Sequence, residues 1–297
     1  MALLRVENLT KRFAARHSIF GGGCSRTVVE EVSLEIRAGE CLALVGETGS
    51  GKSTLGKCLV RLLRADAGSI VYDGRDLCRL SEKEFRPLRQ KFQMIFQNPA
   101  QALNPRQSVA DCLAEVMKVH RRCSNGELPH RVNELLVLVG LNESFAGRLP
   151  HELSGGQRQR VAIARSLAAE PVFVVADEPT SSLDAAIKRQ ILDLLQDLRQ
   201  RLGLTVLLIS HDLAAVGRIA DRIAVMQHGR LVEVAPTESL FRAPSHPYTR
   251  LLLESALRNF KVGGENVTVI DEPGVTCRIV REDQVAEDRD SKFVAGD

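Results

Sequence analysis

The pattern of hydrophobic and polar residues predicts an α/β protein. Strand-length apolar runs occur at Cys41–Val45, Val172–Ala176 and Thr205–Ile209. Apolar residues at helical spacing predict helices at Ser53–Leu63 and Ala186–Arg201. Because apolar strands that alternate with helices are typical of a parallel sheet, we expect an α/β core built on one.

Other segments alternate apolar and polar residues and predict antiparallel strands. Leu3–Leu9 and Val28–Ile36 show this alternation on either side of a glycine-containing loop, and Ser69–Tyr72 precedes an Asp-Gly turn. A hairpin is also expected where His228-Gly229 separates two such runs, Ile223–Gln227 and Leu231–Ala235.

Helical patterns dominate from about residue 86 to residue 169. Val109–Val119 and His130–Val139 carry the clearest of them, so we expect an inserted helical subdomain here. Residues 259–297 are rich in acids and poor in helix-length apolar patterns, which predicts a partly ordered extension.

Composition and charge exclude several classes of protein. With 44% hydrophobic and 26% charged residues, the composition is that of a globular protein and excludes a collagen-like or wholly disordered chain. A net charge of +3 gives no reason to expect a nucleic-acid partner. The longest apolar runs are far shorter than a bilayer span and no secretory signal is evident. The seven cysteines include no C-x-x-C pair, so we expect reduced thiols in a cytosolic protein.

A glycine-rich segment follows the first predicted parallel strand. It fits the pattern G-x-x-x-x-G-K-[ST] and stands between a strand and a helix, the setting of a phosphate-binding loop. Lys52 is expected to reach the β- and γ-phosphates of ATP, and Ser53 to offer its hydroxyl to Mg²⁺. The segment consists of Gly46, Glu47, Thr48, Gly49, Ser50, Gly51, Lys52, Ser53 and Thr54.

Two acids end another predicted strand. Asp177 emerges at the carboxyl end of an apolar run, where ligands bind in open parallel sheets, and can hold Mg²⁺. Glu178, the next residue, can orient or deprotonate the attacking water.

A second glycine segment precedes the predicted helix Arg158–Leu167. Ser154 is a good N-cap and the two glycines expose backbone N–H groups, so this helix start is a second candidate anion site. The stretch Leu153–Leu167, LSGGQRQRVAIARSL, resembles the signature of ABC-transporter ATPases, and the resemblance extends over about residues 3–258. It implies a P-loop NTPase core with a parallel sheet, an antiparallel β subdomain and a helical subdomain at about residues 86–169, with residues 259–297 as an extension.

The resemblance also implies roles for residues to which the neighbouring sequence alone assigns none. Two such ATPases enclose ATP head to tail, so Ser154, Gly155, Gly156 and Gln157 would face nucleotide held by the partner subunit. Gln97 would sense Mg²⁺ and the attacking water, and Asp184, in Ser182-Leu183-Asp184, would cross the dimer interface. His211 would contact the γ-phosphate, and Phe13 would stack on adenine, with Phe20 a weaker candidate. The expected catalytic residues are thus Lys52, Gln97, Glu178 and His211, and the expected Mg²⁺ ligands are Ser53, Gln97 and Asp177.

Three further segments resemble the dipeptide, oligopeptide and nickel importer branch of that family. They are the loop between the first two strands, the stretch from Ile95 to Arg106, and Ser245-His-Pro-Tyr-Thr249. The branch implies a second ATPase subunit, identical or different, two permease subunits and an extracytoplasmic binding protein, with this chain peripheral at the cytoplasmic face of the membrane. Since Cys277 is the only cysteine after Cys123, we expect no iron–sulfur cluster in the extension.

Alternative functions stay open at this point. The chain could power import of nickel or another small solute instead of peptides, or it could be a soluble accessory ATPase of the phosphonate-processing type. A subunit without hydrolytic activity is disfavoured, because Lys52, Asp177, Glu178 and His211 are all present.

Overall fold

A six-stranded sheet forms the centre of the molecule. The computed structural model describes residues 2–14, 25–99, 102–120, 123–124, 126–181, 183–256, 260–262, 265–270 and 278–281. The strand order is β10-β9-β3-β8-β7-β6, and all neighbours run parallel except the β9–β10 hairpin. The strands are β3 (Cys41–Val45), β6 (Phe92–Ile95), β7 (Phe173–Asp177), β8 (Thr205–Ile209), β9 (Arg222–Gln227) and β10 (Arg230–Pro236).

This sheet is buried on both faces. Along β3, Leu42 and Leu44 belong to one hydrophobic cluster, while Cys41, Ala43 and Val45 belong to another on the opposite face. Side chains alternate between the faces of a strand, so a strand covered on both sides needs an unbroken apolar run. The predicted parallel sheet is therefore confirmed.

The strand β6 was not predicted. Phe92–Ile95 lies within the range expected to be helical, so that prediction was wrong for these residues, which form an edge of the parallel sheet. Phe92, Met94 and Ile95 are buried but Gln93 is only partly so, and four residues give too short a pattern to separate a strand from a helix.

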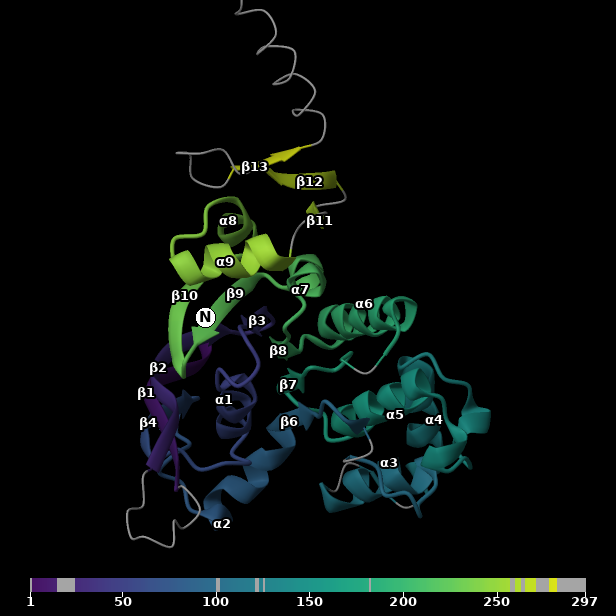
Figure 1. Ribbon diagram of the computed structural model, residues 1–297. Helices are drawn as coiled ribbons and strands as arrows, with labels where there is room; N and C mark the ends of the chain where they lie inside the picture. The colour runs from purple at the N-terminus through teal and green to yellow at the C-terminus, as the bar shows by residue number, and fades with distance from the viewer. Residues whose placement is uncertain are drawn as a thin grey trace, which may run out of the picture.

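A four-stranded antiparallel sheet, in the order β2-β1-β4-β5, forms a second layer. The helix α1 (Lys52–Leu59) lies between this layer and the central sheet (Figure 1) and packs Leu55 and Leu59 into the cluster that both sheets share. The predicted antiparallel subdomain is confirmed. Its strands are β1 (Ala2–Ala14), β2 (Ser25–Arg37), β4 (Ala67–Tyr72) and β5 (Arg75–Asp76).

The helix α1 ends four residues earlier than predicted. Arg61 has a left-handed backbone (φ 57°), and the N–H groups of Leu62 and Leu63 both donate to Lys57 O instead of continuing the helix. The Arg61 guanidinium lies 4.9 Å from the ring centroid of Phe85, a contact of distant residues that local sequence does not reveal.

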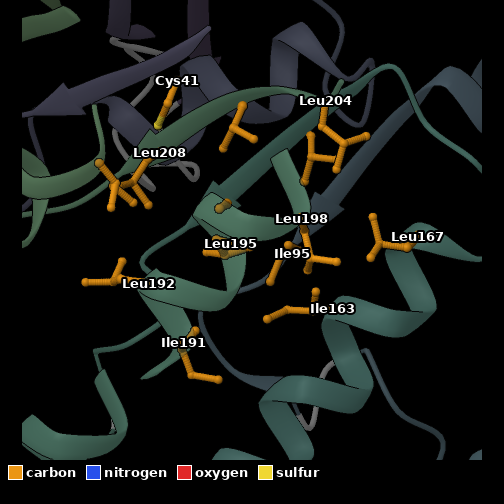
Figure 2. Packing of buried hydrophobic residues seen from close by; sticks show 14 of the residues in the cluster. Cys41, Ile95, Ile163, Leu167, Ile191, Leu192, Leu195, Leu198, Leu204 and Leu208 are labelled. Atoms are coloured by element: carbon orange, nitrogen blue, oxygen red, sulfur yellow. The ribbon is translucent and has the colours of Figure 1, made fainter. Parts of the chain in front are cut away.

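The helices between residues 109 and 167 gather at one side of the molecule (Figure 1). Ile163 and Leu167 of α5 face Ile191, Leu195 and Leu198 of α6 in a shared apolar layer (Figure 2). The group consists of α3 (Val109–Val119), α4 (Leu128–Leu138) and α5 (Gly155–Leu167), with short 3₁₀ turns at Glu143–Phe145 and Pro150–Glu152. The helix α6 (Ala185–Leu202) follows β7, while α2 (Glu82–Phe85) and the 3₁₀ turn Arg86–Lys91 precede β6.

The C-terminal part of the chain returns to the β9–β10 edge. Helices α8 and α9 lie together beyond this hairpin (Figure 1), whose turn is His228-Gly229 as predicted. A three-stranded antiparallel sheet follows, so part of the predicted extension forms regular structure, and the division of the chain near residue 258 stays a prediction. The elements are α7 (Leu213–Ile219), α8 (Thr237–Arg242), α9 (Pro247–Ala256), β11 (Phe260–Val262), β12 (Glu265–Ile270) and β13 (Arg278–Arg281).

The sequence predicted no membrane span and reduced cysteines. In the part of the chain that the structure describes, no helix is both long and apolar enough to cross a membrane. Cys41, Cys58 and Cys112 are buried free thiols, as expected, and burial raises the pKa of Cys41 and of Cys58 to about 12. Cys277 lies outside the described residues.

Candidate functional site

The predicted site residues meet at the carboxyl ends of four neighbouring parallel strands. The phosphate loop follows β3, Gln97 follows β6, Asp177 ends β7 with Glu178 directly after it, and His211 follows β8. Parallel strands bring their carboxyl ends to one edge of a sheet, which is where open α/β sheets bind ligands. Segments spread over more than 160 residues of sequence therefore form one site.

The glycines of the phosphate loop are needed for space as well as for conformation. Gly46 (φ 145°) and Gly51 (φ 107°) have backbones that residues with side chains rarely adopt. A Cβ at Gly46 would lie 2.1 Å from Met226 O of β9, and one at Gly51 would lie 2.4 Å from Val28 O of β2. The loop is therefore pressed against the backbones of two strands.

Two hydrogen bonds hold this loop to the C-terminal half of the chain. The N–H of Gly229, in the β9–β10 turn, donates to Ser50 O at 2.9 Å. The N–H of Glu47 donates to the hydroxyl of Tyr248, at 3.0 Å. The sequence around Tyr248 indicates a branch resemblance but not its contact with the loop, since nothing in the local pattern around either residue points to the other.

Lys52 lies inside the loop that it belongs to. Its side chain is buried, and Nζ donates to Gly46 O and to Glu47 O, both at 2.7 Å. Burial lowers the pKa of Lys52, while the carboxylates of Glu178 and Asp177 act against that change. The ammonium is thus held at the position where the loop would enclose phosphate oxygens.

Ser53 and Asp177 supply neighbouring oxygen atoms. The Ser53 hydroxyl donates to Asp177 Oδ1 at 2.7 Å, although the two residues are 124 positions apart. Burial raises the pKa of Asp177, and the Ser53 hydrogen bond opposes that change. A hydroxyl beside a carboxylate is the kind of oxygen pair that Mg²⁺ takes together with phosphate oxygens, so these residues fit that ion.

Glu178 stands between the other two predicted catalytic side chains. Its Oε1 lies 3.3 Å from Nδ1 of His211, and its Oε2 accepts a hydrogen bond from Nε2 of Gln97 at 3.2 Å. Glu178 has a left-handed backbone (φ 45°), which is strained for a residue with a side chain, and its N–H donates to Ile209 O at 3.0 Å. The structure thus brings together Gln97, Glu178 and His211, as the sequence suggested.

The second glycine segment lies apart from the phosphate loop. Ser154 Oγ accepts from the N–H of Gln157, and Gln157 Oε1 accepts from the N–H of Ser154, which makes the predicted N-cap a full capping box. A Cβ at Gly156 would lie 2.8 Å from Ile187 of α6, and the side chain of Asp184 caps that helix by accepting from Ile187 N–H. Within the described ranges, no hydrogen bond or ion pair joins residues 154–157 or 184 to residues 46–54.

The remaining predicted site residues are exposed or half-buried where the structure describes them. Phe13 of β1 is 40% exposed, so its ring is accessible to a planar ligand. Lys11 Nζ lies 5.4 Å from the ring centroid. Thr48 and Gly49 are exposed and Thr54 is half-buried. Phe20 and Ser182 lie outside the described residues.

Comparison with known sequences identifies the family. The sequence model of the ABC transporter family matches residues 29–181. The oligopeptide transport ATP-binding protein OppF of Bacillus subtilis is 45% identical over 255 residues, covering 85% of this chain and 82% of that protein. The chain belongs to the ABC transporter family. As an ABC ATPase it couples ATP hydrolysis to transport, and the resemblance carried by residues 153–167 is confirmed.

Further comparisons agree with this assignment. A second family model, the C-terminal region of oligopeptide and dipeptide transporters, matches residues 232–275 of the ABC ATPase. A putative peptide import ATP-binding protein of Brucella abortus is 44% identical over 278 residues, 91% of this chain and 83% of that protein.

Solved structures resemble the fold of the ABC ATPase. The ATP-binding cassette MJ0796, solved as a post-hydrolysis dimer with ADP and phosphate, aligns with a TM-score of 0.70 at 30% identity, over 79% of this chain and 98% of that one. The cassette cbiO1 of Clostridium perfringens, part of the cbiONQ transporter complex, aligns with a TM-score of 0.70 at 28% identity, over 86% of this chain and 96% of that one. These structures confirm the predicted fold class, and with the family match they support binding of adenine nucleotides.

Proposed function

We propose that this ABC ATPase powers an importer for di- or oligopeptides, with Glu178 as its catalytic carboxylate. One observation carries the assignment of the site. The Glu178 carboxylate is held between Gln97 and His211, one residue from the Ser53–Asp177 pair and at the same sheet edge as Lys52. The match of residues 232–275 to a peptide-transporter region supports the cargo class.

The phosphate loop binds the nucleotide in this proposal. Lys52 exchanges its backbone partners for oxygens of the β- and γ-phosphates, and the N–H groups at the start of α1 add donors. Ser53, Asp177 and Gln97 would hold Mg²⁺, which when bound neutralises charge on the phosphates. Phe13 stacks its exposed ring on the adenine.

Hydrolysis then depends on Glu178. Its carboxylate accepts a proton from the attacking water, while Gln97 and His211 hold it at a fixed position beside the γ-phosphate. His211 is 55% exposed on its side chain, so it can contact a γ-phosphate in front of the sheet edge without rearrangement of the core.

A second ATPase subunit completes the site in this proposal. Ser154 and Asp184 are exposed, and Gly155, Gly156 and Gln157 are partly so, at the N-terminal ends of α5 and α6. These five residues present N–H groups, a hydroxyl and a carboxylate to a partner, where they would contact nucleotide bound to the other subunit. The dimer of the MJ0796 cassette supports such an assembly.

The transport path belongs to other chains. We infer two permease subunits in the membrane, with this ATPase bound peripherally at their cytoplasmic face, and an extracytoplasmic binding protein that selects the cargo. The relatives named as oligopeptide transport and peptide import ATP-binding proteins support a role in a transporter, and these partners follow from the importer branch that the sequence resembles.

Reconstitution tests this function. The chain is co-expressed with the candidate permease subunits of its own genome, and uptake of a labelled tripeptide into vesicles is measured with ATP and the binding protein. We expect ATP-dependent uptake that Glu178→Gln abolishes. Uptake of labelled nickel in place of peptide would assign the cargo to the alternative, and ATPase activity without any membrane association would refute the importer.

A further inference from the structure

The hydroxyl of Tyr248 contacts the phosphate loop from outside the loop's own part of the chain. It accepts a hydrogen bond from the N–H of Glu47 at 3.0 Å, across 201 positions of sequence. Tyr248 is only 7% exposed, so its ring is fixed by packing while its hydroxyl reaches the loop. In the described part of the chain, this hydroxyl is the acceptor that the Glu47 N–H uses.

The segment that carries Tyr248 is itself anchored to the central sheet. The carboxylate of Glu233, in β10, accepts hydrogen bonds from the N–H groups of Ser245 at 2.8 Å and His246 at 3.0 Å. The N–H of Tyr248 donates to Nδ1 of His246 at 3.2 Å. A chain of polar contacts thus connects β10 to the tyrosine, which makes it a rigid support instead of a loose surface side chain.

The Glu47 residue that Tyr248 contacts is also a partner of Lys52. Glu47 N–H donates to Tyr248, while Glu47 O accepts from Lys52 Nζ at 2.7 Å. The N–H and the C=O of Glu47 are therefore each held by a side chain, Tyr248 from a distant part of the chain and Lys52 from the loop itself. A phosphate loop binds tightly only when its N–H groups already converge, so the position of Glu47 affects the position of the whole loop.

We propose that Tyr248 is a positioning residue, which holds the phosphate loop in its ATP-binding arrangement and makes the C-terminal segment 245–249 part of the nucleotide site. The inference rests on the proposed ATP site at residues 46–54. It adds that nucleotide affinity depends on residues 232–249, which lie beyond the stretch that carries the catalytic motifs.

The conservative variant Tyr248→Phe tests this. It keeps the ring and removes the acceptor, so the loop is expected to spend less of its time in the binding arrangement, and the apparent Kd rises in inverse proportion to that fraction. If about a tenth of the molecules keep the arrangement, the Kd for ATP rises about tenfold. The kcat at saturating ATP is expected to stay close to that of the unmodified protein, because bound nucleotide selects the arrangement that reacts.

The chain offers a matched control in its other tyrosine. Tyr72 lies in β4 and its hydroxyl contacts Lys91 Nζ at 3.3 Å, away from the loop. Tyr72→Phe removes the same atom and is expected to leave the Kd for ATP unchanged. If Tyr248→Phe acted only by destabilising the fold, it would lower the Tm and would not raise KM while leaving kcat unchanged. That result would contradict the positioning role.

The measurement uses the full chain and a fluorescent ATP analogue with Mg²⁺, and hydrogen exchange of the peptide that contains Glu47 as a second readout. We expect a raised Kd and faster exchange at Glu47 in Tyr248→Phe and neither effect in Tyr72→Phe. Glu233→Gln, which weakens the anchor and leaves the tyrosine intact, is expected to raise the Kd by a smaller factor, and it replaces Tyr248→Phe if that variant does not fold. If the unmodified chain binds ATP and these variants bind it with the same Kd, the inference about Tyr248 is overturned and the proposed function is not. If the unmodified chain binds no ATP, the proposed function is overturned together with the inference.

Discussion

The carboxylate of Glu178 lies 3.3 Å from Nδ1 of His211, and the same carboxylate accepts a hydrogen bond from Gln97. The segments that follow β6, β7 and β8 therefore contribute one side chain each to a single cluster. Glu178 takes part through a left-handed backbone conformation at the end of β7, in which its N–H is fixed to Ile209 O of β8. Strain of this kind is retained where a side chain must be held in one position.

The first prediction concerns this carboxylate. Glu178→Gln keeps the shape of the side chain but removes its capacity to accept a proton from water. We expect kcat for ATP hydrolysis to fall about 10²–10⁴-fold, the range typical of general base catalysis, with little change in the Kd for ATP. Steady-state phosphate release and a nucleotide titration measure the two quantities.

An acid away from the site serves as the control. Glu170→Gln changes a carboxylate at the surface, bound to Arg131, and is expected to leave kcat unchanged. If Glu178→Gln hydrolysed ATP at the normal rate, another group would have to be the base and the proposed role of Glu178 would be wrong.

Part of this site could be predicted from the local sequence, and the rest only from the family resemblance. Lys52, Asp177 and Glu178 stand beside short apolar runs, and a buried parallel strand leaves few other interpretations of such runs, so their meeting at one sheet edge could be expected. Gln97 and His211 have no such local signal, and only the family resemblance placed them.

What the sequence did not reveal depends on contacts between distant residues. The strand β6 has four residues and gains its identity from pairing with β7. The early end of α1 follows from the left-handed Arg61, whose side chain packs on Phe85. Tyr248 contacts the loop only because the C-terminal segment returns to the sheet edge. Such contacts depend on tertiary packing, which the local sequence pattern does not predict.

The second prediction concerns Lys52. Lys52→Met removes the ammonium whose hydrogen bonds now go to Gly46 O and Glu47 O and would go to phosphate oxygens. Hydrogen bonds to charged groups contribute about 1.5–3 kcal/mol, so we expect the Kd for ATP to rise about 10–100-fold. Isothermal titration with ATP and Mg²⁺ measures it, and Lys83→Met, on the exposed side of α2, is the control that should bind as before. Equal affinities for the two variants would contradict the proposed role of Lys52.

The third prediction concerns the fit of the loop against β9. Gly46→Ala would place a Cβ 2.1 Å from Met226 O at a φ of 145°, so both the backbone and the neighbour must shift. We expect a loss of about 3 kcal/mol or more of stability together with weakened ATP binding. Thermal unfolding and nucleotide titration check both effects.

Gly74→Ala is the matched control, because it tests the loss of stability that comes from the positive φ alone, without a steric clash. Gly74 also has a positive φ (71°), but a Cβ there would meet nothing within 4 Å. We expect a loss of about 1–2 kcal/mol and unchanged ATP binding. If Gly46→Ala were no more harmful than Gly74→Ala, the close packing of the loop on β9 would not be the constraint that the structure indicates.

The fourth prediction concerns the pH dependence that Glu233 gives to the C-terminal segment. Burial opposes the ionisation of this half-buried carboxylate, but the Thr249 hydroxyl together with Ser245 and the N–H of His246 outweighs it and holds its pKa below the ordinary value of 4.5. A carboxylate whose pKa is depressed in the folded state contributes stability above its unfolded pKa. That contribution is lost as the pH falls from about 4.5 through the folded pKa.

Glu233→Gln should therefore change stability most at neutral pH. We expect a loss of about 1–2 kcal/mol at pH 7, seen as a fall of a few degrees in Tm, because the charged acceptor of two N–H groups is replaced by a neutral one. The difference between variant and unmodified protein should shrink as the pH is lowered below 4.5, since both carry a neutral side chain there. Glu238→Gln, on the exposed surface of α8 beside Arg242, is the control and should show a much smaller change. A difference that stayed constant from pH 7 to pH 3 would mean that the charge of Glu233 does not hold this segment, and that the support of Tyr248 has another origin.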